Sequence, residues 1–176
     1  LKFAADSVTC GQVGSPLASE ISMCGICGFV SLVGDGFGGE VIDRMSNTLE
    51  HRGPDDSGSL WARGEEARLN GRSLELTGVH PEIGLGHTRL AIVDLSRLGR
   101  QPMSNESGSL WITYNGEVYN HAQIRSELEG KGYRFRSKTD TEVVICAYEE
   151  WGEGCLARFN GMFAFAIYDT RDRSLF

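Results

Sequence analysis

Cys24 follows a methionine and opens the segment Cys24-Gly25-Ile26-Cys27-Gly28. If a mature chain began at this cysteine, the residue would carry both a thiol and a free α-amine. A thiol with a pKa near ~8.5 is mostly protonated at neutral pH, whereas an α-amine with a pKa of about 7.7–8.0 is a base poised near working pH. The same nitrogen inside a peptide bond accepts no proton. Cys24 is therefore either an N-terminal nucleophile or, with residues 1–22 attached, an inert thiol.

The same cysteine also fits two simpler interpretations. It could be a small buried hydrophobic residue, which is the commonest role of a free cysteine. With Cys27 it forms one C-x-x-C pair, which is typical of a redox site or of half a zinc site. A second pair with ligand spacing is missing, because Cys146 and Cys155 are nine residues apart. We therefore expect no metal in this chain.

Arg89 is the one charge in the middle of an apolar segment at 85–95, which we predict to be a strand. A buried charge without a partner costs several kcal/mol, roughly, so Arg89 needs a counter-charge. An internal ion pair would satisfy it. A ligand carboxylate would satisfy it equally well, and Arg89 would then be a binding residue.

Asn115 and Gly116 follow a predicted strand at 110–114. Asn-Gly most often forms a hairpin turn. The pair could instead supply one side-chain amide and one close backbone N–H, which together would make an oxyanion hole. Glu117 comes next and could offer a carboxylate or a carbonyl oxygen to a ligand amine.

Thr139 and Glu142 have the spacing of a capping box at the start of a predicted helix. Asp140 takes no part in that box, although it lies at the N-terminus of the same helix. Its structural role would be to interact favourably with the helix dipole. Its functional role would be to hold an ammonium group.

Hydrophobic periodicity places these residues on alternating groups of strands and helices. The strands come in groups joined by short turns, which favours antiparallel sheets with helices packed outside, an α+β arrangement. The expected strands are 24–33, 59–61, 74–76, 85–95, 110–114, 162–168 (buried on both faces) and 174–176. The expected helices are 41–49, 120–130 with Asn120 as N-cap, and 139–152, with a helical turn at 155–159.

Composition restricts the classes of partner. The formal net charge is −7, which argues against a nucleic-acid surface and favours small-molecule ligands. No apolar stretch approaches ~18 residues, so we expect no membrane association. Five cysteines are an odd number in a chain of 176 residues, which favours a reducing cytosol and a cytoplasmic location over a secreted disulfide framework.

The chain divides near Cys24. Residues 1–23 lack an apolar periodic pattern, and we interpret them as a leader, a propeptide or a mis-assigned start, expected to be disordered. Residues 24–176 form one predicted domain, large enough for a sizeable core. The final predicted strand is cut off at Phe176, which indicates a domain truncated at its C-terminus.

Taken together, these segments resemble the glutaminase domain of class II glutamine amidotransferases, which are N-terminal-nucleophile hydrolases that begin with cysteine. Within that superfamily the pattern is most similar to glutamine-hydrolysing asparagine synthetases. The matching stretches are MCGICGFV at 23–30, HRGPDDSG at 51–58, GHTRLAIVDLS at 86–96, GRQPM at 99–103, YNGEVYNH at 114–121, TDTEVVICAYEEWG at 139–152 and FNGMFAFAIYD at 159–169.

The resemblance implies a four-layer αββα sandwich and a role for each matching residue. Cys24 would attack the carboxamide of glutamine, while Asn115 and Gly116 would hold the oxyanion. Arg89 would bind the α-carboxylate of the substrate. Its α-ammonium would be held by two carboxylates, those of Glu117 and Asp140.

The resemblance also implies what lies outside this chain. Ammonia would serve ATP-dependent asparagine synthesis in a C-terminal synthetase domain that is missing here, and ATP and Mg²⁺ are expected only in that domain. A homodimer is compatible with this pattern. Residues 59–84 are longer than the family's usual connection, and we have no physical account of the extra length. The alternatives are a related amidotransferase with another acceptor, or a non-catalytic amino-acid-binding domain if Cys24 is not N-terminal.

Overall fold

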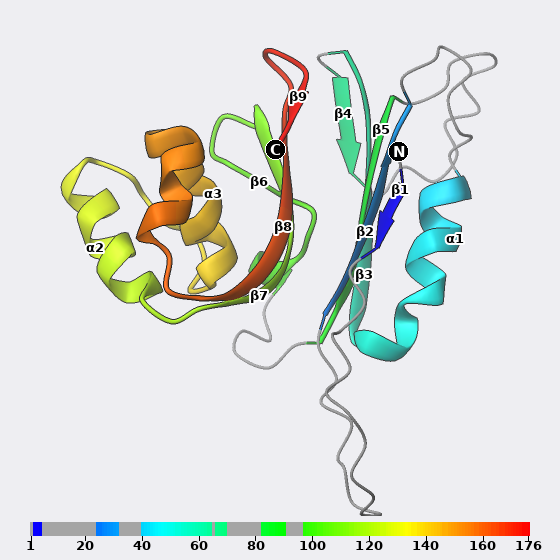
Figure 1. The fold of residues 1–176 in the computed structure, drawn as a ribbon, viewed down its shortest axis with the longest axis horizontal. Coiled ribbons are helices and arrows are strands. Elements are labelled where there is room, and N and C mark those ends of the chain that lie inside the picture. The colour runs from blue at the N-terminus through cyan, green and yellow to red at the C-terminus, as the bar shows by residue number, and fades with distance from the viewer. Residues whose placement is uncertain (1, 5–23, 32–39, 65, 70–81, 91–96) are drawn as a thin grey trace, which may run out of the picture.

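Two antiparallel sheets stack face to face between two layers of helices (Figure 1). The computed structural model describes residues 2–4, 24–31, 40–64, 66–69, 82–90 and 97–176. In Figure 1, helix α1 covers the outer side of one sheet, and helices α2 and α3 cover the outer side of the other. The predicted α+β class and the four-layer αββα order are therefore confirmed.

The first sheet carries the segment that follows Cys24. Its strand order is β1-β2-β5-β3-β4, and every neighbouring pair is antiparallel. Gly25 pairs with Thr88, which places the start of β2 beside the end of β5. The strands are β1 (Lys2–Ala4), β2 (Gly25–Val30), β3 (Asp56–Arg63), β4 (Glu66–Leu69) and β5 (Ile83–Arg89).

The second sheet has the order β6-β7-β8-β9 and is also antiparallel. Its two long strands pair over their whole length, from Leu110 opposite Asp169 to Val118 opposite Gly161. The short strand β6 covers only the first part of the other edge of β7, up to Ile112. The strands are β6 (Met103–Ser104), β7 (Leu110–Val118), β8 (Gly161–Asp169) and β9 (Ser174–Leu175).

The helices agree closely with the predicted ranges. They are α1 (Glu40–Thr48), α2 (His121–Gly130) and α3 (Asp140–Trp151), with 3-10 turns η1 (Glu50–Arg52), η2 (Arg97–Gly99) and η3 (Gly152–Arg158). Asn120 precedes α2, but its side chain does not cap the helix. The side chain bonds instead to the carbonyl of Arg158 and the amide of Asn160, so Asn120 is the N-cap residue by position, as predicted, but without a side-chain cap. The tertiary contact with the start of β8 outcompetes the local one.

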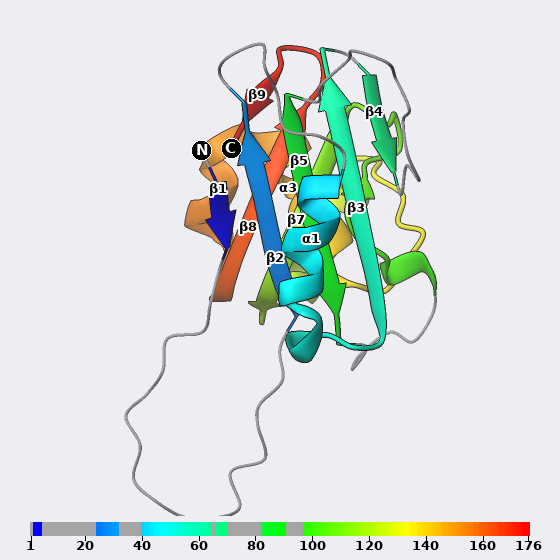
Figure 2. The same cartoon turned by 90° about the vertical axis from the view of Figure 1, so that its right-hand side faces the viewer.

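Three apolar clusters fill the spaces between the four layers. Figure 2 shows α1 lying across β2, β5 and β3, and the cluster beneath it includes Phe29 and Ile42, both fully buried. The space between the sheets is filled by side chains such as Leu85 and Tyr168. The third and largest cluster joins the second sheet to α2 and α3. Burying these surfaces is the main force that holds the sheets at a fixed separation.

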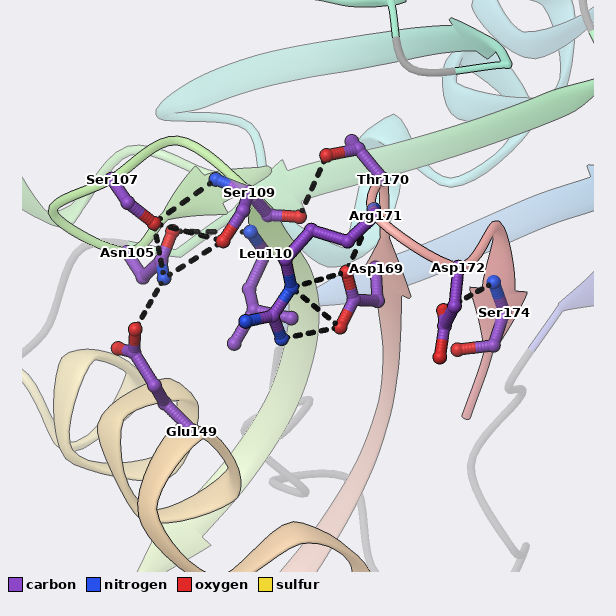
Figure 3. A network of polar contacts seen from close by, with 10 residues as sticks. All are labelled: Asn105, Ser107, Ser109, Leu110, Glu149, Asp169, Thr170, Arg171, Asp172 and Ser174. Atoms are coloured by element: carbon purple, nitrogen blue, oxygen red, sulfur yellow. Dashed lines mark hydrogen bonds and ion pairs between the residues drawn. The ribbon is translucent and has the colours of Figure 1, made fainter.

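A polar network links α3 to the end of the second sheet where β7 begins and β8 ends (Figure 3). The Asn105 side chain accepts from the Leu110 N–H at 3.0 Å and donates to Glu149 of α3 at 2.9 Å. On the neighbouring strand end, Arg171 forms an ion pair with the buried Asp169. These contacts satisfy polar groups where the ladder ends, and none involves a predicted site residue.

Some predicted elements differ from the observed ones. Residues 2–4 form β1, so the expected disorder is wrong for them; residues 5–23, and the strands predicted at 74–76 and beyond residue 90, lie outside the described residues. Asn115 and Gly116 lie inside β7, so the hairpin-turn interpretation is wrong. Met162 is 68% exposed, so β8 is buried on both faces only in its second half. The division of the chain into a leader and one domain stays a prediction.

Candidate active site

Cys24 lies directly before β2, where its sulfur meets the end of β5. The Leu90 N–H donates to Cys24 Sγ at 3.4 Å, and the Arg52 guanidinium donates to the Cys24 carbonyl, also at 3.4 Å. The residue is half-buried, and this burial raises the pKa of its thiol above the ordinary value of 9.0. The Leu90 contact and the nearby Arg89 charge act in the opposite direction but do not outweigh burial. A separate base is therefore needed to form the thiolate near neutral pH.

Arg89 ends β5 and is only 8% exposed. The loop after α1 packs directly on its backbone: the Asp55 N–H donates to the Arg89 carbonyl at 3.0 Å, and Pro54 forms a parallel bridge to the same residue. At the other end of the side chain, the guanidinium lies so close to Gly99 that a Cβ there would collide with Arg89 Nη2. The Gly99 backbone thus lies against the guanidinium, while the loop fixes the backbone of Arg89.

Asp140 is the first residue of α3, and its carboxylate turns toward β7. Oδ2 accepts from the Tyr114 hydroxyl at 2.6 Å and from the Val118 N–H at 3.0 Å. Its charge acts on the pKa of the Cys24 thiol, as does that of Arg89. The structure therefore brings together a thiol, a cation and a carboxylate that lie far apart in the sequence.

The capping box predicted before Asp140 is only half present. The Thr139 hydroxyl accepts from the Glu142 N–H at 3.3 Å, as predicted. The buried Glu142 carboxylate does not return to the Thr139 N–H; it accepts from the backbone of Arg136 and Ser137 instead. This part of the prediction is wrong, because the loop before α3 supplies better-placed donors.

Asn115, Gly116 and Glu117 occupy the last part of β7. Thr113, two residues earlier, reaches across the gap and donates to the Gly86 carbonyl of β5 at 3.0 Å. Strand alternation places Asn115 and Glu117 on this same inner face, toward the sheet that carries Cys24. β7 thus carries these side chains along the gap toward the end of the first sheet where β2 begins.

Gly116 has a φ of 151°, which favours glycine. A Cβ on Gly116 would also collide with the Met162 carbonyl and with Phe163. Along β7, amides two residues apart point to the same edge, so the Gly116 N–H lies between those of Tyr114 and Val118. Gln101 and Asp140 accept the two flanking N–H groups. The Gly116 N–H is left pointing to the open edge between them, as an oxyanion donor would.

Several residues around this site had no role assigned from the sequence. Arg52, Leu90, Gly99, Gln101 and Tyr114 all contact the predicted site residues or the strand that carries them. All five lie in the quoted motifs HRGPDDSG, GHTRLAIVDLS, GRQPM and YNGEVYNH, which is the one signal that could have found them. Tyr114 belongs to the last of these motifs. Because it fits the pattern of a regular strand, its hydroxyl contact could not be predicted from the sequence.

A cavity of about 520 Å³ lies elsewhere, between the loop after β6, the segment after α2 and one side of α3. None of the predicted site residues lines it. Its polar groups bond to one another, as in the pair Asn105–Glu149 of Figure 3. The lining residues are Ser104, Asn105, Glu106, Ser107, Lys131, Gly132, Tyr133, Arg134, Arg136, Glu142, Cys146 and Glu149.

The family model of the glutamine amidotransferase domain matches residues 23–176. The chain belongs to this family. The match starts one residue before Cys24 and includes every residue of the site described above. The chain is therefore a glutamine amidotransferase domain.

Curated relatives of this glutamine amidotransferase domain are glutamine-hydrolysing asparagine synthetases. Asparagine synthetase 3 of Bacillus subtilis strain 168 is 40% identical over 160 residues, covering 88% of this chain and 22% of that protein. A putative asparagine synthetase 2 of Methanocaldococcus jannaschii is 34% identical over 172 residues, covering 88% of this chain and 29% of that protein. The domain is thus homologous to the glutaminase half of these enzymes, and it spans less than a third of their length.

Two solved structures share the fold. The glutamine phosphoribosylpyrophosphate amidotransferase of B. subtilis, complexed with ADP and GMP, has a TM-score of 0.57 and 26% identity, covering 70% of this chain and 31% of that one. A structure described as the allosteric regulatory enzyme of purine biosynthesis has a TM-score of 0.62 over 84% of this chain and 35% of that one. Its 23% identity supports likeness of fold alone. No helix in the described ranges has the length and apolar character needed to cross a membrane.

Proposed function

We propose that this domain hydrolyses the side-chain amide of glutamine to glutamate and ammonia, with Cys24 as the nucleophile of a mature chain that begins at this residue. The observation that carries the proposal is the meeting of Cys24, Arg89 and Asp140 at one end of the gap between the sheets. A thiol, a cation and a carboxylate together match the carboxamide, the α-carboxylate and the α-ammonium of glutamine.

The reaction has two halves. Cys24 Sγ attacks the carboxamide carbon after its proton passes to the α-amine, which gives a tetrahedral intermediate with a negative oxygen. The Asn115 side-chain amide and the Gly116 N–H hold that oxygen. The C–N bond then breaks, and ammonia leaves with the proton from the α-ammonium. Water attacks the resulting thioester, the C–S bond breaks, and glutamate and the thiol are released.

Substrate selection depends on both ends of the amino acid. The Arg89 guanidinium pairs with the α-carboxylate in a charge-assisted contact. Asp140 and Glu117 hold the α-ammonium; the first is fixed by Tyr114 and Val118, and the second is exposed at the end of β7. An amide lacking either charged group would lose one of these contacts and bind more weakly.

The ammonia is used, we propose, for ATP-dependent synthesis of asparagine from aspartate by a C-terminal synthetase domain outside this chain. The support for this step is the similarity to asparagine synthetases of B. subtilis and M. jannaschii. The domain spans 22% of the first protein and 29% of the second. The roles proposed for Asn115 and Gly116 on β7 are the same whichever acid finally accepts the ammonia.

The test uses the folded chain cleaved at a protease site inserted directly before Cys24. With glutamine, it should release equal amounts of glutamate and ammonia, and added hydroxylamine should trap the thioester as γ-glutamyl hydroxamate. Cys24→Ala should release neither. Hydroxamate formation by the Cys24→Ala variant, or equal activity in the uncleaved chain, would refute the assignment of the nucleophile.

A further inference from the structure

The Asp140 carboxylate is fixed through only one of its two oxygens. Oδ2 accepts both the Tyr114 hydroxyl, at 2.6 Å, and the Val118 N–H, at 3.0 Å. Within the described ranges, no hydrogen bond of this side chain goes to Oδ1. One oxygen is therefore held by the protein, and the other is available to a ligand.

The position of Asp140 in the chain makes this orientation depend on its partners. As the first residue of α3, it lies beside the free N–H groups of the first helical turn. A carboxylate there can rotate to bond those groups, as capping side chains do. The two donors from the second sheet draw it toward β7 instead.

Tyr114 is itself held at both ends. Its N–H donates to Gln101 Oε1 at 2.6 Å, beyond the last residue of β7 that β6 covers. The amide of Gln101 then donates to the Thr141 hydroxyl of α3 at 3.3 Å. The ring is only 3% exposed and packs in the core between the sheet and the helices. The hydroxyl therefore has one position from which to reach Asp140.

The Tyr114 hydroxyl stays a donor over the whole working pH range. Burial, and after it the Asp140 charge, raises the pKa of Tyr114 well above the ordinary value of 10.0. A neutral donor facing an ionised carboxylate makes a charge-assisted hydrogen bond, which is stronger than a bond between neutral groups.

We propose that Tyr114 is a positioning residue for recognition of the substrate amine. Its hydroxyl fixes Asp140 through Oδ2, so that Oδ1 faces the α-ammonium of glutamine. Gln101 supports this arrangement by holding the backbone of Tyr114. The inference rests on the proposed function, because it concerns the same glutamine site.

The test measures binding without turnover. In the chain carrying Cys24→Ala and cleaved directly before residue 24, Kd values are measured by calorimetry or NMR titration for glutamine and for glutaramate, the same amide without the α-amino group. Tyr114→Phe should raise the Kd for glutamine about tenfold, as expected for loss of a hydrogen bond to a charged group. It should leave the Kd for glutaramate within about twofold, since that ligand has no ammonium for Asp140 to hold.

Two further variants separate positioning from a general effect on the fold. Tyr168→Phe also removes one buried hydroxyl contact, to the Gly64 carbonyl at 2.8 Å, and should leave both Kd values unchanged. In an Asp140→Asn background, Tyr114→Phe should add little to the Kd for glutamine, because its effect acts through the lost carboxylate.

The outcomes are distinguishable. An equal rise in Kd for both ligands, no rise for glutamine, or full additivity with Asp140→Asn would overturn the positioning role of Tyr114. Failure of the Cys24→Ala chain to bind glutamine at all would overturn the proposed function, and this inference with it. A selective rise in the Kd for glutamine that is lost in the Asp140→Asn background supports the proposal.

Discussion

The backbone N–H of Leu90 points at the sulfur of Cys24, with 3.4 Å between the nitrogen and the sulfur. The residue that follows Arg89 therefore contacts the thiol of Cys24, and the cation and the sulfur are positioned by one strand end. A single displacement of β5 would move both the proposed carboxylate-binding residue and the proposed nucleophile.

The pH dependence of alkylation at Cys24 tests the need for a separate base. Because burial raises the pKa of the Cys24 thiol, iodoacetamide should modify it slowly at neutral pH in the uncleaved chain, with the rate rising above pH 9. After cleavage before Cys24, the new α-amine should move this rise to lower pH. Peptide mapping by mass spectrometry separates Cys24 from the buried Cys27, Cys146 and Cys155. Identical pH profiles before and after cleavage would contradict the role of the amine.

Gly99→Ala should weaken glutamine binding while leaving the fold almost intact. The new methyl group would collide with the tip of the Arg89 side chain and would lie 3.2 Å from Thr139 Cγ2. The guanidinium can swing aside at little cost in stability, but it then misses the substrate carboxylate. We expect KM for glutamine to rise about tenfold and kcat to change little, as for loss of a contact made equally in the ground and transition states.

Gly130→Ala is the matched control, because its new methyl group meets nothing within 4 Å. Steady-state kinetics on both variants, each cleaved before Cys24, would show whether KM rises in Gly99→Ala and not in Gly130→Ala. A normal KM in Gly99→Ala would show that the place of Arg89 beside this glycine has no part in binding.

Gly116→Ala should be strongly destabilising. The φ of 151° is unfavourable for alanine, and its Cβ would collide with backbone atoms of β8 that cannot move aside. We expect a loss of about 2 kcal/mol or more in the free energy of unfolding, measured with urea. Gly108→Ala is the control, because φ there is 75° and the new Cβ has open space around it. This variant therefore measures the cost of the backbone conformation without a steric clash. Equal losses for the two variants would show that close packing against β8 is unimportant.

His87 should make the fold sensitive to acid. Its side chain is almost fully buried, and this burial lowers the pKa of His87 from 6.5 to about 4. Between these two pH values the unfolded chain binds more protons than the folded one, so stability falls as pH drops through this window and the loss levels off below about pH 4. The shift corresponds to roughly 3 kcal/mol.

Urea unfolding at several pH values checks this contribution by comparison with His87→Gln, which lacks the titrating ring. The difference in stability between the two chains should change between pH 6.5 and about 4. The exposed His51 gives a surface control in His51→Gln. A pH-independent difference between the parent chain and His87→Gln would contradict the buried neutral imidazole. Carboxylates also titrate in this range, so only the difference between variants is informative.

Much of the fold could be predicted from periodicity and local signals. The helix at 139–152 and its Thr139 cap follow from spacing alone, and the observed helix is Asp140–Trp151. The strand after Cys24 and the grouping of strands into antiparallel sheets follow from alternation and short turns. Such signals are local, which is why they survive without knowledge of the tertiary structure.

The parts that could not be predicted depend on contacts between distant segments. Asn115 and Gly116 form strand and not turn, because β8 pairs along the whole of β7. Gln101 had no periodic pattern around it, and its role comes from the N–H of Tyr114, which β6 is too short to reach. The link from Tyr114 to Asp140 joins residues 26 positions apart. Only the packing of α3 on the second sheet creates it.

The short length of β6 has a consequence for the behaviour of the whole molecule in solution. Past Ile112, β7 has an open side of the kind that readily recruits strands from other molecules. The side chains of Gln101 and Asp140 occupy the donors at Tyr114 and Val118 and so block such recruitment. The two side chains that support the proposed glutamine site thus also cover the open edge of β7, and loss of both would leave the domain prone to self-association.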